Sequence, residues 1–377
     1  MTLLSIFFAI GIASLGIGIV IPIIPSLIKN VSEGHNLYMG LSATIMALTF
    51  SLASFPIGIW IDKTCSKNAI IFGLIVYGLS MLMFPLFNSL SSFLIIRGIE
   101  GIGWGGIWMG TETLINQLSP PKERGRNMGI YGFSIALGMG GGPMIGAWFT
   151  KFGIVYPFAI CFGLTFLSLL FTIRYIKRSP IIKKPEIKSA LSLFDLRVAL
   201  GAAVLYGIFE ASMISMFPIY LLSMSFDRYT LSMVIVSFFV GGILFQIPSG
   251  KVADKIGKER VLLIISLLLV AVLFTFSFVT SKVPALILGF FAGGLGGAFY
   301  PIGLSIIPDK VKPDQLGIGN ANFTFMYGIG SIIGPISIAV LMDLLDVKAL
   351  FYSFLPLIFI FVVLCNIKGS SNAEINH

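Results

Sequence analysis

Long apolar segments separated by short polar ones recur along the whole chain. A helix needs about 20 apolar residues to cross the hydrocarbon core of a bilayer, where it must satisfy its own backbone hydrogen bonds. Segments of about this length lie at residues 3–28, 38–61, 69–88, 91–116, 127–149, 153–173, 198–224, 229–250, 261–280, 284–306, 317–341 and 349–367. We therefore expect an all-α membrane protein with twelve transmembrane helices.

The pattern excludes two other interpretations of these segments. Strands of a transmembrane barrel alternate apolar and polar residues over about 10 positions, whereas residues 261–279 are apolar on every face. A signal peptide has a basic leader and a small-residue cleavage site, and the first segment has neither. We expect the first segment to be a retained helix.

The composition supports a membrane protein and argues against several kinds of site. Of 377 residues, 56% are hydrophobic and 11% are charged, and the mean hydropathy is +0.99, whereas about a quarter of the residues in soluble domains are charged. Cys65, Cys161 and Cys365 lie far apart, and His35 and His377 form no cluster. We therefore expect no disulfide framework, no metal site and no other cofactor. The apolar segments contain neither histidine nor a nucleophile paired with a base, so we expect that the protein is not an enzyme.

The basic residues predict the orientation in the membrane. With the N-terminus in the cytoplasm, most of the 25 lysines and arginines fall in cytoplasmic loops, as the positive-inside rule requires. We expect a multi-pass protein of the plasma or inner membrane with both termini cytoplasmic. The net charge of +9 is spread over alternate loops, so we expect the lipid bilayer, and not nucleic acid, as its partner.

A repeat with an offset of 192 residues divides the chain into two halves. Pro56, Gly58, Asp62 and Lys63 recur as Pro248, Gly250, Asp254 and Lys255, Gly125 recurs as Gly317, and Gly138, Gly142 and Pro143 recur as Gly330, Gly334 and Pro335. Such offsets predict a parallel repeat of six helices, as in many transporters. Between the halves lies a polar stretch with seven basic residues. We expect an N-terminal bundle at 1–173, a cytoplasmic linker at 174–197 and a C-terminal bundle at 198–377.

The repeated loop after the second segment of each half combines acids and bases at a helix end. An aspartate at a helix C-terminus opposes the helix dipole, so it gains from a cation or from another helix's N-terminus. A contact of this kind could form and break as the protein moves. The alternative is that the aspartates only end helices and the lysines only fix topology. The residues are Asp62, Lys63 and Lys67 in the first copy and Asp254, Lys255, Lys258 and Arg260 in the second.

These motifs resemble those of the major facilitator superfamily. The second loop copy, Gly250 to Arg260, fits the family's loop signature closely. In the first copy, Cys65 stands where the family usually has glycine. The resemblance implies two six-helix bundles that rock about a central cavity, with the loop residues governing closure on the cytoplasmic side. The fifth segment has glycines at the spacing of the family's antiporters, at Gly138, Gly142, Pro143 and Gly146. From the residues alone, these glycines predict close helix packing and the proline a kink.

Four ionisable residues lie within the predicted spans: Arg97, Glu100, Glu112 and Glu210. A charge at the membrane centre costs at least about 2.5–3.5 kcal/mol, so each should face a cavity or a partner. In the span at 91–116, helical geometry places Arg97, Glu100, Trp104, Trp108 and Glu112 on one face over about 22 Å. This face suits a translocation path. The alternatives are that Arg97 and Glu100 pair with each other, that Glu112 reaches water at the helix end, and that the tryptophans only pack.

Glu210 is the best candidate for a proton-carrying residue. It lies in the middle of its span, one turn from Tyr206 and without a base in its own segment. The alternative is a permanently neutral acid bonded to Tyr206. Polar residues that could orient a substrate are Gln246, Tyr300, Asn320, Asn322 and Tyr327.

Taken together, these features predict a secondary active transporter that works by alternating access. We expect proton-coupled export of a small organic compound, as in multidrug-efflux antiporters, with the proton gradient as energy source and a monomer as the working unit. The residues at 3–28 include no acid, although many proton-coupled drug exporters have one there. The alternative is uptake or exchange of a sugar or an anionic metabolite, the latter through Arg97.

Overall fold

The computed structural model describes residues 2–32, 35–120, 124–177, 193–311 and 316–366, and within them the structure is helical without strands. The helices are α1 (Thr2–Val20), α2 (Ile23–Val31), α3 (Asn36–Lys63), α4 (Ser66–Met83), η1 (Phe84–Leu86), α5 (Leu90–Leu118), α6 (Arg124–Phe149), η3 (Thr150–Phe152), α7 (Val155–Tyr175), α8 (Arg197–Ser223), α9 (Arg228–Ile256), α10 (Lys258–Phe276), α11 (Lys282–Gly297), α12 (Phe299–Lys310), α13 (Leu316–Leu344), α14 (Ala349–Tyr352) and α15 (Phe354–Asn366).

Each predicted apolar segment coincides with a helix or with a broken pair of helices, so the all-α membrane fold is confirmed. Ten spans among the described residues are long and apolar enough to cross a membrane. α5 and α6 occupy the remaining two places. α5 carries three ionisable residues and both helices are rich in glycine, which explains their lower hydropathy.

Three spans that the sequence predicted as single helices are broken, each about four residues before a proline. Proline has no N–H, so it cannot donate to the carbonyl four positions earlier. The first span breaks between α1 and α2, before Pro25; the second between α11 and α12, before Pro301; and the third between α14 and α15, before Pro356.

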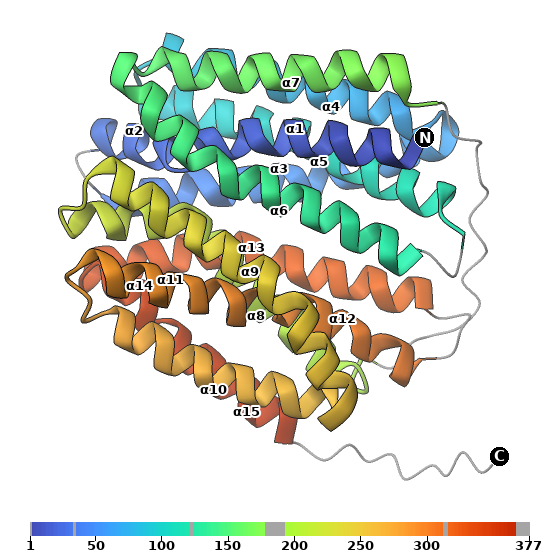
Figure 1. Ribbon diagram of the computed structural model, residues 1–377, viewed down its shortest axis with the longest axis vertical. Coiled ribbons are helices and arrows are strands. Elements are labelled where there is room, and N and C mark those ends of the chain that lie inside the picture. The colour runs from blue at the N-terminus through green and yellow to red at the C-terminus, as the bar shows by residue number, and fades with distance from the viewer. Residues whose placement is uncertain (1, 33–34, 121–123, 178–192, 312–315, 367–377) are drawn as a thin grey trace.

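The helices form two bundles, α1–α7 and α8–α15, and the start of α1 and the end of α15 lie toward the same end of the molecule (Figure 1). We call this the terminal end and the other the opposite end. Buried aromatic side chains, such as Phe158 and Phe276, fill the interior of each bundle, while Phe166 and Leu267 are exposed on the outside. Apolar side chains on the outer surface fit a surrounding of lipid. Most of the predicted linker lies outside the described residues, and the predicted domain boundaries stay a prediction.

The two bundles pack their helices in the same way, as the 192-residue repeat predicts. Gly101 of α5 lies against the backbone carbonyl of Met46 in α3. Gly293 of α11, 192 residues later, lies against the carbonyl of Phe238 in α9. Side chains larger than hydrogen would separate both helix pairs.

The bundles touch each other near the opposite end. The carboxylate of Asp343, at the end of α13, accepts hydrogen bonds from the backbone N–H of Asn36 (2.8 Å) and of Leu37 (2.7 Å) at the start of α3. It also accepts one from the Asn36 side-chain amide (2.9 Å). Deeper along the same helices, the Thr44 hydroxyl donates to the Ile332 carbonyl (2.9 Å).

Near the terminal end the bundles are apart. α6 and α9 run close together near the opposite end and separate toward the terminal end (Figure 1). Side-chain atoms added at Gly58 of α3, Gly129 of α6 or Gly250 of α9 would meet nothing within 4 Å. At Gly140, further toward the opposite end of α6, an added Cβ would lie 3.1 Å from Phe239 of α9. The bundles are therefore joined near the opposite end, and α6 and α9 are further apart toward the terminal end.

The start of α9 shows how a span is fixed at the membrane surface. The Asp227 carboxylate accepts hydrogen bonds from the backbone N–H groups of Tyr229 (3.2 Å) and Thr230 (3.4 Å). Such a cap satisfies N–H groups that have no partner in the helix. Hydrogen bonds to Thr230 hold the pKa of Asp227 below its ordinary value.

Candidate substrate and proton path

Glu210 lies in the middle of α8 with both carboxylate oxygens bonded to tyrosines. The Tyr206 hydroxyl donates to Oε1 at 2.8 Å, and the Tyr327 hydroxyl donates to Oε2 at 2.6 Å. Tyr206 is one turn earlier on the same helix, whereas Tyr327 comes from α13. α13 reaches Glu210 because Gly207 of α8 lies against the Tyr327 carbonyl. Among the described residues, no cation pairs with Glu210.

Tyr300 completes a group of three tyrosine rings around this acid. Its ring centroid lies 5.4 Å from that of Tyr206 and 5.6 Å from that of Tyr327. Tyr300 belongs to α12, just after the break that Pro301 causes. It lies within electrostatic range of Glu210 and also of Glu112 in the first bundle. The second bundle thus gathers three tyrosine rings, Tyr206, Tyr300 and Tyr327, two of which bond Glu210.

Arg97 and Glu100 form an ion pair, with 2.6 Å between Arg97 Nη1 and Glu100 Oε2. Their side chains are only 12% and 3% exposed. Arg97 Nε also donates to the backbone carbonyl of Ser42 in α3, at 3.5 Å. The pairing that the sequence left open is therefore present, and it ties α5 to α3.

Glu112 lies further along the same face of α5 in an aromatic setting. Trp108 lies one helical turn before Glu112 on α5. The ring of Trp108 lies 5.6 Å from Trp104 and 5.8 Å from Tyr131 of α6. Tyr77 of α4 extends this row, 6.3 Å from Trp104. The predicted face of α5 thus continues onto neighbouring helices of the first bundle.

Other predicted polar residues do not join these acids in the described contacts. Gln246 on α9 is exposed, and Asn322 on α13 is half-buried and has a partner of its own. Asn320, near the start of α13, is exposed.

The loop residues are divided between bonded and exposed side chains. Lys67 donates to the Ile173 carbonyl at the end of α7 (2.8 Å). Lys258 donates to the Asp309 carboxylate and to the Ser305 carbonyl, both at 2.6 Å. Lys63, Asp254, Lys255 and Arg260 are exposed. The side chain of Asp62 lies outside the described part of the structure. Within the described residues Asp254 has no partner, in keeping with separation at the terminal end.

The glycines of α6 pack against α1. A Cβ at Gly138 would lie 2.6 Å from the Gly11 carbonyl oxygen, and at Gly142 and Gly146 it would collide with the backbone around Ile19. Pro143 lies within α6 and is buried there. In the second bundle, Gly330 and Gly334 meet α8 in the same manner.

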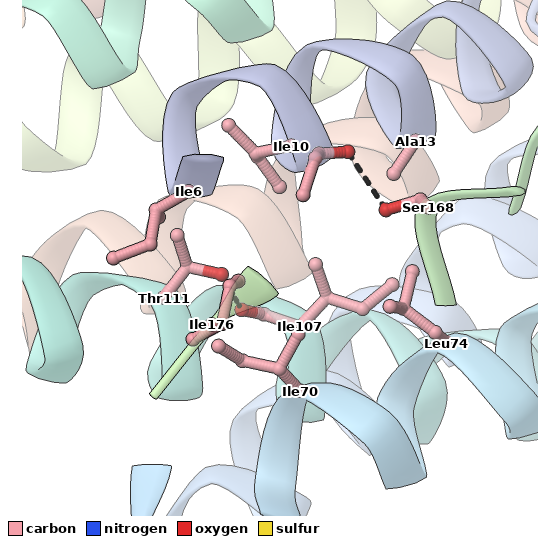
Figure 2. A pocket seen from close by; sticks show the side chains of 10 residues that line it. Ile6, Ile10, Ala13, Ile70, Leu74, Ile107, Thr111, Ser168 and Ile176 are labelled. Atoms are coloured by element: carbon pink, nitrogen blue, oxygen red, sulfur yellow. Dashed lines mark hydrogen bonds between the residues drawn. The ribbon is translucent and has the colours of Figure 1, made fainter. Parts of the chain in front are cut away.

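Two hollows among the described residues are apolar and contain none of these acids. One, of about 10 Å³, lies inside the first bundle between residues such as Ile10, Leu74 and Ile107 (Figure 2). At the edge of this space, the Ser168 hydroxyl donates a hydrogen bond to the Ala9 carbonyl (2.8 Å). This space holds about one water molecule and no organic substrate. The other, of about 690 Å³, is a groove on α3, α4 and α5 lined by Trp60 and other mainly apolar residues.

Sequence reasoning missed two residues, Tyr131 and Asp343. Tyr131 lies in a glycine-rich span, 127–149, that contains no charged residue, so nothing in the sequence distinguished it from packing residues. Asp343 did carry a signal, because it is an acid at a helix C-terminus, which is the same feature that drew attention to Asp62 and Asp254.

Comparison with known sequences places the chain in a family. The sequence profile of the Major Facilitator Superfamily matches residues 6–229 and, overlapping these, 198–370. The MFS-type transporter YfkF of Bacillus subtilis is 29% identical over 353 residues, which cover 91% of this chain and 89% of YfkF. The MFS-type transporter YcaD of Escherichia fergusonii is 27% identical over 285 residues, 74% of each chain.

Solved structures show the same fold. The nucleoside transporter NupG aligns with a TM-score of 0.79 at 14% identity, over 97% of this chain and 100% of that one. The human organic anion transporter MFSD10 aligns with a TM-score of 0.71 at 18% identity, over 97% and 99%. Since the family profile matches nearly the whole chain and its relatives are transporters, this protein belongs to the Major Facilitator Superfamily and is a multi-pass membrane transporter.

Proposed function

We propose that the protein exports a small organic compound in exchange for protons, and that Glu210 carries the proton. The observation that supports this most is the position of Glu210: an acid in mid-span, hydrogen-bonded by Tyr206 and Tyr327 and without a cationic partner among the described residues. An ionised acid in a membrane is costly to bury. Proton binding removes that cost when the cavity closes around the acid.

The tyrosines give the proton site a link to helix movement. Tyr206 shares α8 with Glu210, so that hydrogen bond moves with the acid. Tyr327 is on α13, and Asp343 lies near the C-terminus of the same helix, at the opposite end of the molecule. A shift of α13 against α8 would change the hydrogen bonding of Glu210, and the contact with α3 would change in the same movement. Protonation and gating would thereby be coupled.

Alternating access gives the open and closed ends their roles. With both termini in the cytoplasm, the terminal end is the cytoplasmic side, and the conformation is open to the inside. Asp343 then stabilises closure of the outer side. When the bundles rock the other way, the aspartates of the two loops, Asp62 and Asp254, would find partners at the terminal end.

The geometry favours export of a neutral or cationic compound over exchange of an anionic metabolite. An anion would have to displace Glu100 from Arg97, where the two groups are 2.6 Å apart and almost fully buried. Removing one partner from such a buried ion pair leaves the other charge buried without compensation, which costs about 3–5 kcal/mol.

Transport in proteoliposomes tests this proposal. A panel of radiolabelled organic amines, nucleosides and carboxylates is offered with an imposed pH gradient, and accumulation is compared with exchange at equal pH. We expect a compound to accumulate only in the compartment from which protons flow out, and the gradient to be required. In Glu210→Gln, accumulation should be lost while exchange remains. Accumulation without a pH gradient, or unchanged in Glu210→Gln, would contradict the proposal.

A further inference from the structure

Glu112 is an acid of the first bundle that the proton site does not use. The indole of Trp108, one helical turn earlier on α5, carries no charge. The basic residue within α5, Arg97, is 15 positions away, about 22 Å along a helix, and is paired with Glu100. Among the described residues, Glu112 therefore has no cation that balances its charge.

Tyr131 adds a second unsatisfied group to the same place. Its side chain is 3% exposed, and its hydroxyl has no hydrogen-bond partner within the described structure. A buried polar group without a partner costs about 1–3 kcal/mol, so a hydroxyl of this kind calls for a partner that is absent here. The Glu112 carboxylate lies within electrostatic range of this hydroxyl.

Aromatic faces surround the two polar groups. The rings of Trp104, Trp108 and Tyr131 follow one another at 5.6 and 5.8 Å between centroids. Aromatic faces attract organic cations through the ring quadrupole, tryptophan most strongly. An acid beside tryptophan and tyrosine rings is thus suited to a positively charged group with an apolar body.

This group lies close to a residue of the second bundle. Tyr300 of the second bundle is within electrostatic range of both Tyr131 and Glu112. A movement of the bundles against each other would therefore change the surroundings of Tyr131.

We propose that Glu112, Trp108 and Tyr131 form a subsite for the protonated amine of the substrate, and that it selects primary and secondary ammonium groups. This rests on the proposed transport of an organic compound and names its chemical class. One N–H of the ammonium donates to the Glu112 carboxylate and a second donates to the Tyr131 hydroxyl, while the apolar body lies on the tryptophans. A quaternary ammonium has no N–H and leaves Tyr131 unpaired. Substrate and proton then use separate acids in separate bundles.

Binding to purified protein tests the subsite without reference to transport. The probes are naphthylmethylamine and its N-methyl, N,N-dimethyl and N,N,N-trimethyl derivatives, which keep one apolar body and lose N–H groups stepwise. Titration is followed by tryptophan fluorescence and checked by calorimetry. We expect the primary and secondary amines to bind about tenfold more tightly than the quaternary one, which is the effect of one hydrogen bond to a buried group.

Variants separate the roles of the two polar groups. In Tyr131→Phe the preference for N–H-bearing amines should disappear, while the quaternary probe binds as before. Glu112→Gln should weaken every probe by about tenfold or more, and Glu112→Asp, which keeps the carboxylate, should retain part of the affinity. Gel filtration verifies that each variant is monodisperse.

Binding of the probes to Glu210→Gln distinguishes an error in the proposed subsite from an error in the proposed proton mechanism. We expect it to bind the four probes in the wild-type order even though its proton coupling is lost. Equal affinity for all four probes in the wild type, an unchanged preference in Tyr131→Phe, or unchanged affinity in Glu112→Gln would overturn the subsite, as would the absence of binding by any amine. None of these results would bear on whether Glu210 carries protons.

Discussion

At the scale of single residues, the two hydrogen bonds to Glu210 are the feature with the most direct chemical consequence. Tyr327 donates across from α13 to α8, so it joins the acid to a helix that also contacts the first bundle. A hydrogen bond to a charged group contributes about 1.5–3 kcal/mol.

We expect Tyr327→Phe to lower gradient-driven transport by about tenfold or more, because the ring remains and one hydrogen bond of about 1.5 kcal/mol or more is lost. Rates of accumulation in proteoliposomes measure this. Tyr220→Phe is the matched control. Tyr220, on α8, likewise donates a hydrogen bond from its hydroxyl, but to the Phe276 carbonyl (3.1 Å) and not to the acid. If the two variants transport equally well, the hydroxyl of Tyr327 has no role in coupling.

The sequence identified the acids but only some of their partners. Burial of charge in a membrane is so costly that Glu112 and Glu210 were conspicuous in the sequence. Tyr206 could also be predicted, because it lies one helical turn from Glu210. Tyr327 and Tyr131 could not be assigned, because their contacts depend on how α13 packs against α8 and α6 against α5, and helical periodicity within one span carries no such information.

At the scale of helices, close packing at glycines positions the spans. The α1–α6 contact excludes any side chain at Gly142, whereas Gly129 on the same helix has open space around it. Alanine at an open helix position stabilises by about 0.5–1 kcal/mol relative to glycine, while an added methyl group in a packed interface costs about 1–3 kcal/mol.

We therefore expect Gly142→Ala to lower thermal stability and Gly129→Ala to leave it unchanged or raise it slightly. The melting temperature of detergent-purified protein measures the difference. Because the packing is repeated, Gly334→Ala in the second bundle should behave like Gly142→Ala. Equal melting temperatures for Gly142→Ala and Gly129→Ala would be incompatible with the α1–α6 contact.

The contact between the end of α13 and the start of α3 joins helices of the two bundles. α3 begins without a cap from its own residues, since His35 makes no side-chain capping bond, and Asp343 of the other bundle supplies one instead. A negative charge at a helix N-terminus contributes about 0.3–1 kcal/mol, in addition to the hydrogen bonds.

We expect Asp343→Asn to favour opening of the opposite end, by about five- to thirtyfold in the ratio of conformations if 1–2 kcal/mol is lost. Spin labels at Asn30 and Leu345, in a variant without the three native cysteines, report the distance across that end. Asp346→Asn is the control, because Asp346 bonds only within its own loop, to the Lys348 N–H at 2.7 Å. A distance distribution that is the same in both variants would exclude a role for Asp343 in closure.

At the scale of the whole molecule, the two bundles are built alike and should move against each other. The repeat in the sequence predicted this symmetry, since its offset relates Gly101 to Gly293 and Gly142 to Gly334. The arrangement that the molecule adopts, with α6 and α9 further apart toward the terminal end, could not be predicted, because the same sequence must support both states of a transporter.

We expect the two ends to move in opposite directions. Labels at Thr64 and Ile256, which are equivalent positions in the repeat at the ends of α3 and α9, report the terminal end. In Asp343→Asn this distance should shorten in the same fraction of molecules in which the opposite end widens, because one rotation changes both. Ends that open independently would contradict alternating access.

The most direct test of proton coupling through Glu210 is proton movement evoked by substrate. Proteoliposomes that enclose a pH-sensitive dye are given the amine probes and other organic compounds, with wild-type protein, Glu210→Gln and Glu112→Gln. We expect the wild type to move protons in response to at least one compound, and Glu210→Gln to move none although it still binds that compound. Proton flux that persists unchanged in Glu210→Gln, or that no compound evokes in the wild type, would show that Glu210 is not the proton carrier.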